Sequence, residues 1–333
     1  MRAIPRALRT FHVDDRQPDE DLLADALAGL SATPKRLPSK YFYDTRGSKL
    51  FEHICELPEY YPTRVELALM QGNIEAIADT LGPDVRLVEY GSGSGLKTRM
   101  LLRHLASPVA YVPVEISRGA LDASVSNLGR EFPRIEMLPV CADFTRPITL
   151  PRAARAPHQT VVYFPGSTIG NFDQGNALRL LRHMRDEAMQ GGGALPGGVL
   201  IGVDLAKDKV RLEAAYNDSA GVTAEFTLNL LVRMNHELGA DFDLAGFRHR
   251  ARWHALAGRI ETHIVSMRDQ HVHIGDRAFH FGKGETMLVE YSCKYTLNVF
   301  ARLAARAGLE VAKVWTDPAR QFSVQWLVCA RNE

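Results

Sequence analysis

One segment near residue 90 limits the fold more than any other: an apolar run that ends in an acid and enters three glycines spaced two apart. It reads Leu87-Val88-Glu89-Tyr90-Gly91-Ser92-Gly93-Ser94-Gly95. Glycine is needed where a strand reverses tightly into a helix while its backbone approaches a ligand, because any Cβ would obstruct the turn or the ligand. The segment therefore predicts a strand, a ligand-binding loop and a helix that begins near Leu96.

A second acid follows where a nucleotide-type cofactor requires one. Residues 110–114 read as the next strand, which leads into Glu115, where a carboxylate can accept hydrogen bonds from the two hydroxyls of an adenosine ribose. A dinucleotide fingerprint has a third glycine where this chain has Leu96, whereas Glu-x-Gly-x-Gly-x-Gly is usual in the S-adenosylmethionine loop of Rossmann-like methyltransferases. The pattern favours S-adenosylmethionine, held by Gly91 and Gly93, over the cofactor of a NAD(P)-dependent oxidoreductase. A glycine-rich surface turn is the alternative, and the order of strand, loop, helix and acid-ended strand weighs against it.

Charge and cysteine usage narrow the class of function. The chain has 40 basic and 39 acidic residues, so its net charge of +1 provides no field that would attract nucleic acid or an anionic membrane. The four cysteines have no Cys-x-x-Cys spacing, which argues against a zinc site and a disulfide framework and favours a reducing cytoplasm. No apolar run is long enough to span a membrane, and nothing marks an interface. We expect a cytoplasmic monomer that acts on a small neutral or zwitterionic molecule.

The order of periodic segments predicts one sheet domain with an insertion. Strand patterns occur at residues 85–90, 110–114, 135–140, 160–164, 199–203, 259–267, 271–281, 310–316 and 323–329, and helical patterns at 19–30, 65–81, 117–128, 211–217, 224–238 and 297–307, the last capped by Gly308. Residues 40–64 are dense in aromatic side chains, which suggests a pocket wall. We therefore predict an α/β, Rossmann-like sheet with an inserted α+β substrate-binding domain. The cofactor domain is expected at residues 65–204 plus 294–333, and the substrate domain at 15–64 plus 205–293.

Several long motifs follow one another in a consistent order from about Pro34 onward. They are Tyr41-Phe42-Tyr43-Asp44 with Gly47-Ser48, Leu57-Pro58-Glu59-Tyr60-Tyr61-Pro62-Thr63-Arg64, Gly91-Ser92-Gly93 with Lys97-Thr98-Arg99, Phe164-Pro165-Gly166-Ser167-Thr168-Ile169-Gly170-Asn171-Phe172, Asp204-Leu205, Ala214-Ala215-Tyr216-Asn217-Asp218, and Glu290 with Ser292, Lys294 and Tyr295. Together these motifs resemble the L-histidine Nα-methyltransferase family of ergothioneine biosynthesis. The resemblance covers nearly the whole chain and is more specific than the glycine loop alone.

The resemblance implies a class I methyltransferase sheet and a defined reaction. Methyl groups would pass from S-adenosylmethionine to the α-amino nitrogen of L-histidine until the trimethylated betaine, hercynine, is reached, with no metal. Because the sulfonium methyl is displaced in line, the protein mainly orients the reactants and supplies electrostatics. The α-amine of a free amino acid is mostly protonated near neutral pH, so the pocket must favour the neutral amine.

The resemblance also assigns roles to residues around the acceptor. Asn171 and Tyr43 are the first candidates for favouring the neutral amine. Asn171 would hold the amine through its side-chain carbonyl, with Gly166 in the same loop. Tyr43, Tyr60 and Tyr216 would hold the carboxylate or nearby waters. Without the resemblance, Asn171 could equally be a left-handed turn residue, and either tyrosine of the Tyr60-Tyr61 pair could be ordinary packing.

Further roles concern the imidazole and the cofactor. By resemblance, Glu290 and Ser292 would recognise the imidazole, and the two-residue period of a strand places them on one face. Glu290 could otherwise be a solvated strand residue. The cofactor residues implied are Gly91, Gly93 and Lys97 in the loop, Glu115 on the ribose, and Asp143 and Phe144 on the adenine amino group and ring.

Position 262 departs from the family pattern. The histidine enzymes usually read Arg-Ile-Glu-Met-His, whereas this chain has Thr262 in place of the methionine that shapes the side-chain end of the amino-acid pocket. The related tryptophan-methylating enzymes combine a smaller residue here with loss of the glutamate, yet Glu290 is retained. Retention favours histidine, because an indole offers a buried carboxylate only one N–H. Another aromatic amino acid such as tryptophan is the second candidate, and a noncatalytic binding module is a further alternative.

Overall fold

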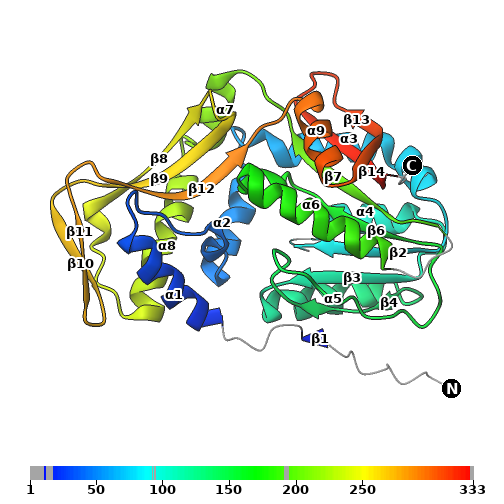
Figure 1. Ribbon diagram of the computed structural model, residues 1–333, viewed down its shortest axis with the longest axis horizontal. Helices are drawn as coiled ribbons and strands as arrows, with labels where there is room; N and C mark the ends of the chain where they lie inside the picture. Colours follow the sequence, from blue (N-terminus) through cyan, green and yellow to red (C-terminus); the bar gives the residue numbers. More distant parts are fainter. Residues whose placement is uncertain (1–10, 13–17, 92, 94, 191–194, 331–333) are drawn as a thin grey trace.

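A mostly parallel β-sheet is the largest element of the fold (Figure 1). In the computed structural model, which describes residues 11–12, 18–91, 93, 95–190 and 195–330, its strands lie in the order β1-β5-β3-β2-β6-β7-β14-β13, and β4 also pairs with β3. The pairs from β1 to β7 are parallel, whereas β14 is antiparallel to both β7 and β13. The strands are β1 (Phe11–His12), β2 (Val85–Tyr90), β3 (Ala110–Glu115), β4 (Glu136–Met137), β5 (Val140–Cys141), β6 (Gln159–Phe164), β7 (Gly198–Asp204), β13 (Leu309–Thr316) and β14 (Phe322–Cys329).

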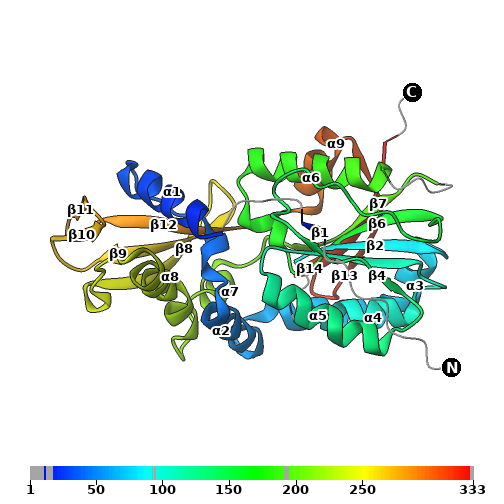
Figure 2. The same ribbon diagram turned by 90° about the horizontal axis from the view of Figure 1, so that it is seen from below.

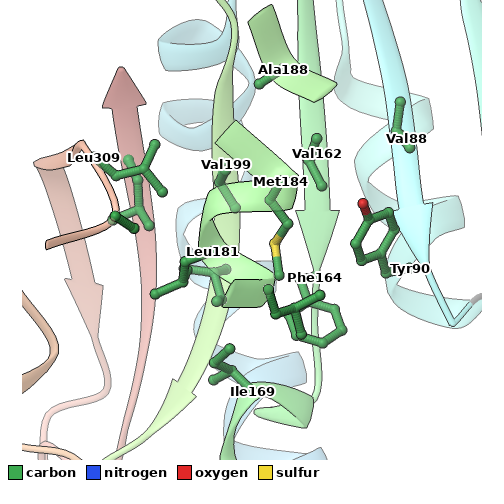
Figure 3. Close-up of a cluster of buried hydrophobic side chains, with 14 of the residues drawn as sticks. Val88, Tyr90, Val162, Phe164, Ile169, Leu181, Met184, Ala188, Val199 and Leu309 are labelled. Atoms are coloured by element: carbon green, nitrogen blue, oxygen red, sulfur yellow. The ribbon is translucent and has the colours of Figure 1, made fainter. Parts of the chain in front are cut away.

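Helices cover both faces of this sheet (Figure 2). Every residue of β2 is buried, and its side chains alternate between the two faces. Val85 and Leu87 pack with α3 and α4, whereas Val88 and Tyr90 belong to the apolar cluster on the side of α6 and α9 (Figure 3). The helices are α3 (Tyr61–Leu81), α4 (Leu96–His104), α5 (Arg118–Glu131), α6 (Gln174–Met189) and α9 (Leu297–Arg306). Within the described residues, none of the helices is both long and apolar enough to cross a membrane.

A second, antiparallel sheet with the order β12-β9-β8 lies beside the first (Figure 1). An apolar core joins it to the N-terminal helices, to α8 and to a separate hairpin formed by β10 and β11. The elements are α1 (Pro18–Ser31), η1 (Ser39–Phe42), α2 (Thr45–Glu56), η2 (Thr168–Asn171), α7 (Lys209–Ala215), α8 (Val222–Leu238), η3 (Leu244–Gly246), β8 (Phe247–His254), β9 (Arg259–Ser266), β10 (Gln270–Ile274), β11 (Arg277–Phe281) and β12 (Thr286–Cys293). The N-terminal segment also pairs with the second sheet: the amide of Leu37 donates to the carbonyl of Leu288 at 2.8 Å.

The predicted α/β fold with a Rossmann-like sheet is confirmed, and β2 has the predicted bounds. Some element boundaries were wrong. The strand expected at 135–140 is two short strands, β4 and β5, because Pro139 between them lacks a backbone N–H. The strand expected at 271–281 is a hairpin whose turn contains Gly275, with φ of 55°. The C-cap of α9 is Ala307 rather than the expected Gly308. Gly308 is the next residue and has φ of 78°.

Candidate active site

A cavity of about 1310 Å³ opens where the carboxyl ends of the parallel strands meet the second sheet and the N-terminal helices. Open α/β sheets bind their ligands at this edge. Residues expected from the sequence to bind cofactor or substrate line it: Tyr43, Tyr60, Gly91, Gly93, Lys97, Glu115, Asp143, Phe144, Gly166, Asn171, Tyr216, Glu290 and Ser292. Thr262 is the expected site residue that is not part of this lining.

The glycine loop joins β2 to α4 with its backbone in the left-handed region. Gly91 has φ of 73° and Gly95 has φ of 68°, a conformation that side chains disfavour. Glu89, the acid before the loop, is buried, and its carboxylate accepts hydrogen bonds from the hydroxyls of Thr98 and Tyr111. Burial raises the pKa of Glu89 to about 7, although these hydrogen bonds oppose the shift. Glu89 therefore ties the first turn of α4 to β3 and fixes the shape of the loop.

Lys97 lies at the start of α4 and points toward the loop that follows β6. Its Nζ pairs with the carboxylate of Glu66, a buried residue of α3. The same carboxylate accepts the backbone N–H of Gly166 at 2.9 Å. Glu66 thus connects the glycine loop to the loop that carries Gly166. Sequence reasoning missed Glu66, because an acid within an amphipathic helix gives no local signal that it is buried.

Two acids and an aromatic ring lie at the ends of neighbouring strands: Glu115 ends β3, and Asp143 and Phe144 follow β5. Glu115 accepts the backbone N–H groups of Ile116 and Ser117 at 3.0 and 3.3 Å. Asp143 Oδ1 accepts the N–H of Thr145 at 2.9 Å, which leaves Oδ2 3.8 Å from the Lys40 ammonium. The Phe144 ring stacks on Tyr90, with centroids 5.2 Å apart and an interplanar angle of 16°. The arrangement offers carboxylates for hydroxyl or amino groups and a rigid apolar ring.

Asn171 reaches the cavity through a tightly packed turn. Left-handed conformations occur at Gly166 and Ser167, with φ of 78° and 56°, and Asn171 ends the short helix η2 that follows. A Cβ on Gly170 would lie 2.8 Å from the carbonyl oxygen of Cys293, so the glycine lets η2 lie directly on β12. Strand β12 carries Glu290. The left-handed turn residues are therefore the two before η2, and Asn171 is placed beside the second sheet.

An aromatic wall follows the N-terminal segment. Tyr43 meets Phe51 and Phe226 edge to face, with ring centroids 5.6 and 5.5 Å apart, and Tyr60 lies 6.1 Å from Tyr216 in the same manner. Burial raises the pKa of Tyr43, and the Glu290 carboxylate adds to the shift. The phenol therefore stays protonated and can donate a hydrogen bond. Of the other aromatic residues in this stretch, Tyr41 and Phe42 are buried in the core.

Glu290 and Ser292 are on β12 and line the cavity. The pairing of β12 with β9 shifts register between Leu288 and Glu290, directly before these two residues. Thr262 is 1% exposed and lies behind Glu290, where its hydroxyl donates to Oε2 at 3.2 Å. Burial raises the pKa of Glu290 to about 7, while this hydrogen bond and the charge of Lys294 oppose the shift. Position 262 thus contacts the carboxylate rather than the open cavity.

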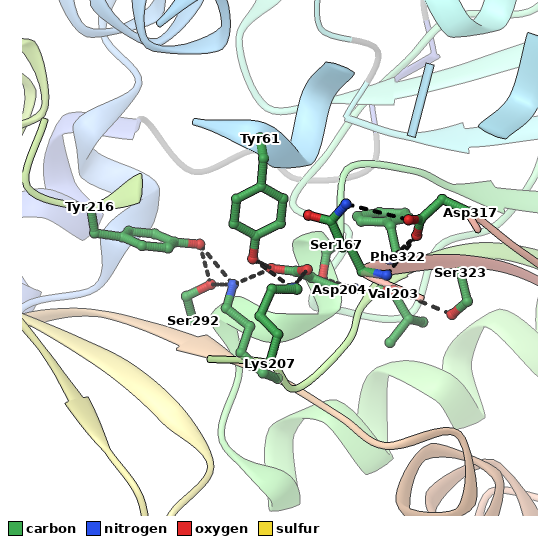
Figure 4. Close-up of polar contacts among 12 residues, drawn as sticks. Tyr61, Ser167, Val203, Asp204, Lys207, Tyr216, Ser292, Asp317, Phe322 and Ser323 are labelled. Atoms are coloured by element: carbon green, nitrogen blue, oxygen red, sulfur yellow. Dashed lines mark hydrogen bonds and ion pairs between the residues drawn. The ribbon is translucent and has the colours of Figure 1, made fainter. Parts of the chain in front are cut away.

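A buried polar cluster supports this end of the site (Figure 4). Asp204, at the end of β7, has no exposed surface and pairs with Lys207 and Lys294. It also accepts the hydroxyl of Tyr61 at 2.7 Å, so Tyr61 is a packing and hydrogen-bonding residue whereas Tyr60 lines the cavity. Burial alone would raise the pKa of Asp204, but the two ammonium groups outweigh it and lower the pKa below 3.8.

Comparison with known proteins identifies close relatives. A family model described as histidine-specific methyltransferase, SAM-dependent, matches residues 22–329. The histidine N-alpha-methyltransferase of Mycolicibacterium smegmatis is 42% identical over 317 residues, which cover 93% of this chain and 95% of that protein. The protein of the same name from Mycobacterium tuberculosis is 41% identical over 309 residues, covering 91% and 93%. Ergothioneine biosynthesis protein 1 of Neurospora crassa is 28% identical over 297 residues, which cover 85% of this chain and 32% of that protein.

Proposed function

Because the chain belongs to the family of histidine-specific, S-adenosylmethionine-dependent methyltransferases, we propose that it methylates the α-amino nitrogen of L-histidine until hercynine is formed, as a step of ergothioneine biosynthesis. The observation that carries the proposal is that Asn171 and Glu290 line one cavity together with the glycine loop. One cavity therefore combines a loop suited to the methyl donor, the Asn171 amide for the α-amine and the Glu290 carboxylate for the imidazole ring.

The residues of the glycine-loop end fit S-adenosylmethionine. Gly91 has a positive φ that side chains disfavour, and it lies beside Phe144, with an added Cβ 4.0 Å from Cε1 of that ring. Gly91, Gly93 and Lys97 would hold the amino-acid portion of the cofactor, Glu115 the ribose, and Asp143 with Phe144 the adenine. When bound, the cofactor supplies an electrophilic methyl group on sulfur. The chain itself supplies orientation and a pocket with a largely aromatic wall.

The opposite end fits an amino acid with a polar ring. The Asn171 side-chain carbonyl would accept an N–H of the α-amine, and Tyr43 would donate or accept beside it. The aromatic wall lowers the local polarity and so disfavours the ammonium form, which has no lone pair for methyl transfer. Tyr60 would bind the carboxylate, and the Tyr216 oxygen would accept from a water beside it. Glu290 with Ser292 would bind the imidazole. Gly166 would let the backbone of its loop approach the amine, and Thr262 would act on the ring through Glu290.

The two proposed domains correspond to the two sheets and bind different ligands. We assign residues 65–204 plus 294–333 to the cofactor and residues 15–64 plus 205–293 to the substrate. The four cysteines are free thiols, which supports a reducing cytoplasm as the place of action. A monomer is proposed because the cavity already contains the residues that both ligands need.

Binding and turnover test the proposal together. Calorimetry is expected to show binding of S-adenosylhomocysteine and no binding of NAD. Addition of L-histidine and S-adenosylmethionine should release S-adenosylhomocysteine, and L-tryptophan should give a much slower release. Binding of NAD alone would remove the cofactor assignment. Absence of turnover with any amino acid, despite cofactor binding, would instead identify a binding module.

A further inference from the structure

Lys294 is a buried lysine with no role in the scheme above. It follows Cys293 at the end of β12, and its side chain is 1% exposed. The ammonium contacts three oxygens: Asp204 Oδ2 at 2.7 Å, Ser292 Oγ at 2.8 Å and the Tyr216 hydroxyl at 2.9 Å. An ammonium has three hydrogen-bond donors and no acceptor, so these contacts use all of its donors.

The two hydroxyls that receive these bonds also bond to each other. Tyr216 and Ser292 have their oxygens 2.6 Å apart, and both line the cavity. Between them they hold two protons, of which one lies in their mutual hydrogen bond. A phenol is a stronger acid than an alcohol, so Tyr216 is the favoured donor in this pair. Ser292 then accepts from both Lys294 and Tyr216, which fills both of its acceptor positions.

A hydroxyl with both acceptor positions filled can only donate to a ligand. We propose that Lys294 is a positioning residue for substrate specificity, which holds Ser292 as a hydrogen-bond donor toward the cavity. The ring of the substrate must then present a lone pair to Ser292 and an N–H to Glu290. A neutral imidazole meets both demands with its two nitrogens, whereas an indole has an N–H and no ring lone pair, and an imidazolium has two N–H groups and none.

This inference rests on the proposed function and adds the residue that sets the polarity of the ring site. Removal of the ammonium leaves Asp204 with Lys207 and Tyr61, so its charge stays compensated. Lys294→Met keeps most of the side-chain length without the donors. Lys294→Arg keeps the charge opposite Asp204, but a planar guanidinium cannot direct three donors at these three oxygens in the same way.

The test is a double-mutant cycle that measures the Kd of L-histidine on the protein saturated with S-adenosylhomocysteine. We expect Lys294→Met and Lys294→Arg each to raise this Kd about tenfold in the wild-type background and less than threefold in a Ser292→Ala background. The Kd of S-adenosylhomocysteine should stay within twofold throughout, which controls for folding. Lys294→Arg carries the test if the methionine variant does not fold.

Two outcomes separate this inference from the function on which it rests. If wild type binds histidine and the lysine variants weaken binding equally with and without the Ser292 hydroxyl, Lys294 does not act through Ser292 and the inference is overturned. If wild type itself binds no histidine in the presence of S-adenosylhomocysteine, the proposed function is wrong and the inference fails with it.

Discussion

Thr262 and Glu290 are paired across strands β9 and β12, and the threonine hydroxyl donates to the glutamate carboxylate at 3.2 Å. The resemblance predicts that position 262 shapes the side-chain end of the amino-acid pocket, yet Thr262 is 1% exposed and does not line the cavity. Thr262 therefore acts through a hydrogen bond to the charged form of an acid that lines the cavity. Its effect on the substrate should appear through the protonation of Glu290.

Thr262→Val removes this hydrogen bond and keeps the shape of the side chain. Because a hydrogen bond to a carboxylate lowers its pKa, its loss should raise the pKa of Glu290 above the value of about 7. Histidine affinity is lost as Glu290 becomes protonated on lowering the pH. The midpoint of this loss should then lie about one pH unit higher in the variant. The Kd of histidine measured from pH 5 to 9 checks this. An unchanged midpoint, or one at lower pH, would show that Thr262 does not stabilise the carboxylate.

Glu290→Gln should make the unliganded protein more stable at alkaline pH. The pKa of Glu290 is raised from 4.5 to about 7 by burial, so the folded state binds this proton more tightly than the unfolded state. The stability that the group contributes is present below pH 4.5 and is lost as the pH rises to 7, with the difference constant above that. The variant should therefore gain about 3 kcal/mol over wild type at pH 8.

Urea unfolding at pH 8 and pH 5 measures this difference without ligand. The gain should be smaller at pH 5, where the wild-type glutamate is protonated in the folded state. A variant less stable than wild type at pH 8 would show that the charged form of Glu290 does not destabilise the folded protein, which contradicts the raised pKa. The expected gain in stability comes with a loss of histidine affinity, since the amide is a weaker acceptor than the carboxylate.

Asn171→Ala should reduce turnover with histidine at least tenfold, which corresponds to about 1.4 kcal/mol of transition-state stabilisation. The loss arises because no side-chain carbonyl remains to hold the α-amine. Steady-state release of S-adenosylhomocysteine measures it. The matched control is Asn73→Ala on α3, where the amide bonds to the carbonyl of Leu69 and does not line the cavity. Equal turnover in the two variants would remove Asn171 from the site.

Gly170→Ala tests whether the close contact between η2 and β12 sets the position of Asn171. The added Cβ would lie 2.8 Å from the carbonyl oxygen of Cys293, so the backbone must move. We expect kcat/KM for histidine to fall more than tenfold, with a smaller effect on binding of S-adenosylhomocysteine. Gly72→Ala on α3 is the control, because a Cβ there meets no atom within 4 Å. It should keep full activity and raise the Tm slightly, since alanine favours the helix.

The central sheet could be predicted because its strands have local signals. The run at 85–90 is mostly apolar and leads into glycines, and the structure shows a strand with these bounds that is buried on both faces. Strand β8 lacked such a signal: Arg248, Arg250 and Arg252 alternate with residues that pack against α8 and α7, and a strand so rich in charge resembles a loop in sequence. Pro139 interrupts the segment at 135–140 because it has no backbone N–H, and it separates β4 from β5.

The sequence indicated site residues only where a motif resembled one of known role in the family. The sequence indicated Asn171, Glu290 and the glycine loop, and the structure lines one cavity with them. It gave no sign that Glu66 joins Lys97 to Gly166, or that Lys294 joins Asp204 to Ser292. These pairs connect positions on different elements, and their partners follow from tertiary packing rather than from spacing along the chain.

The measurement that tests the account most directly is mass spectrometry of the products formed from a panel of amino acids with isotope-labelled S-adenosylmethionine. The account predicts that histidine is the preferred acceptor and gains three labelled methyl groups, all on the α-amino nitrogen. Label on the imidazole ring, or a preference for tryptophan over histidine, would contradict it.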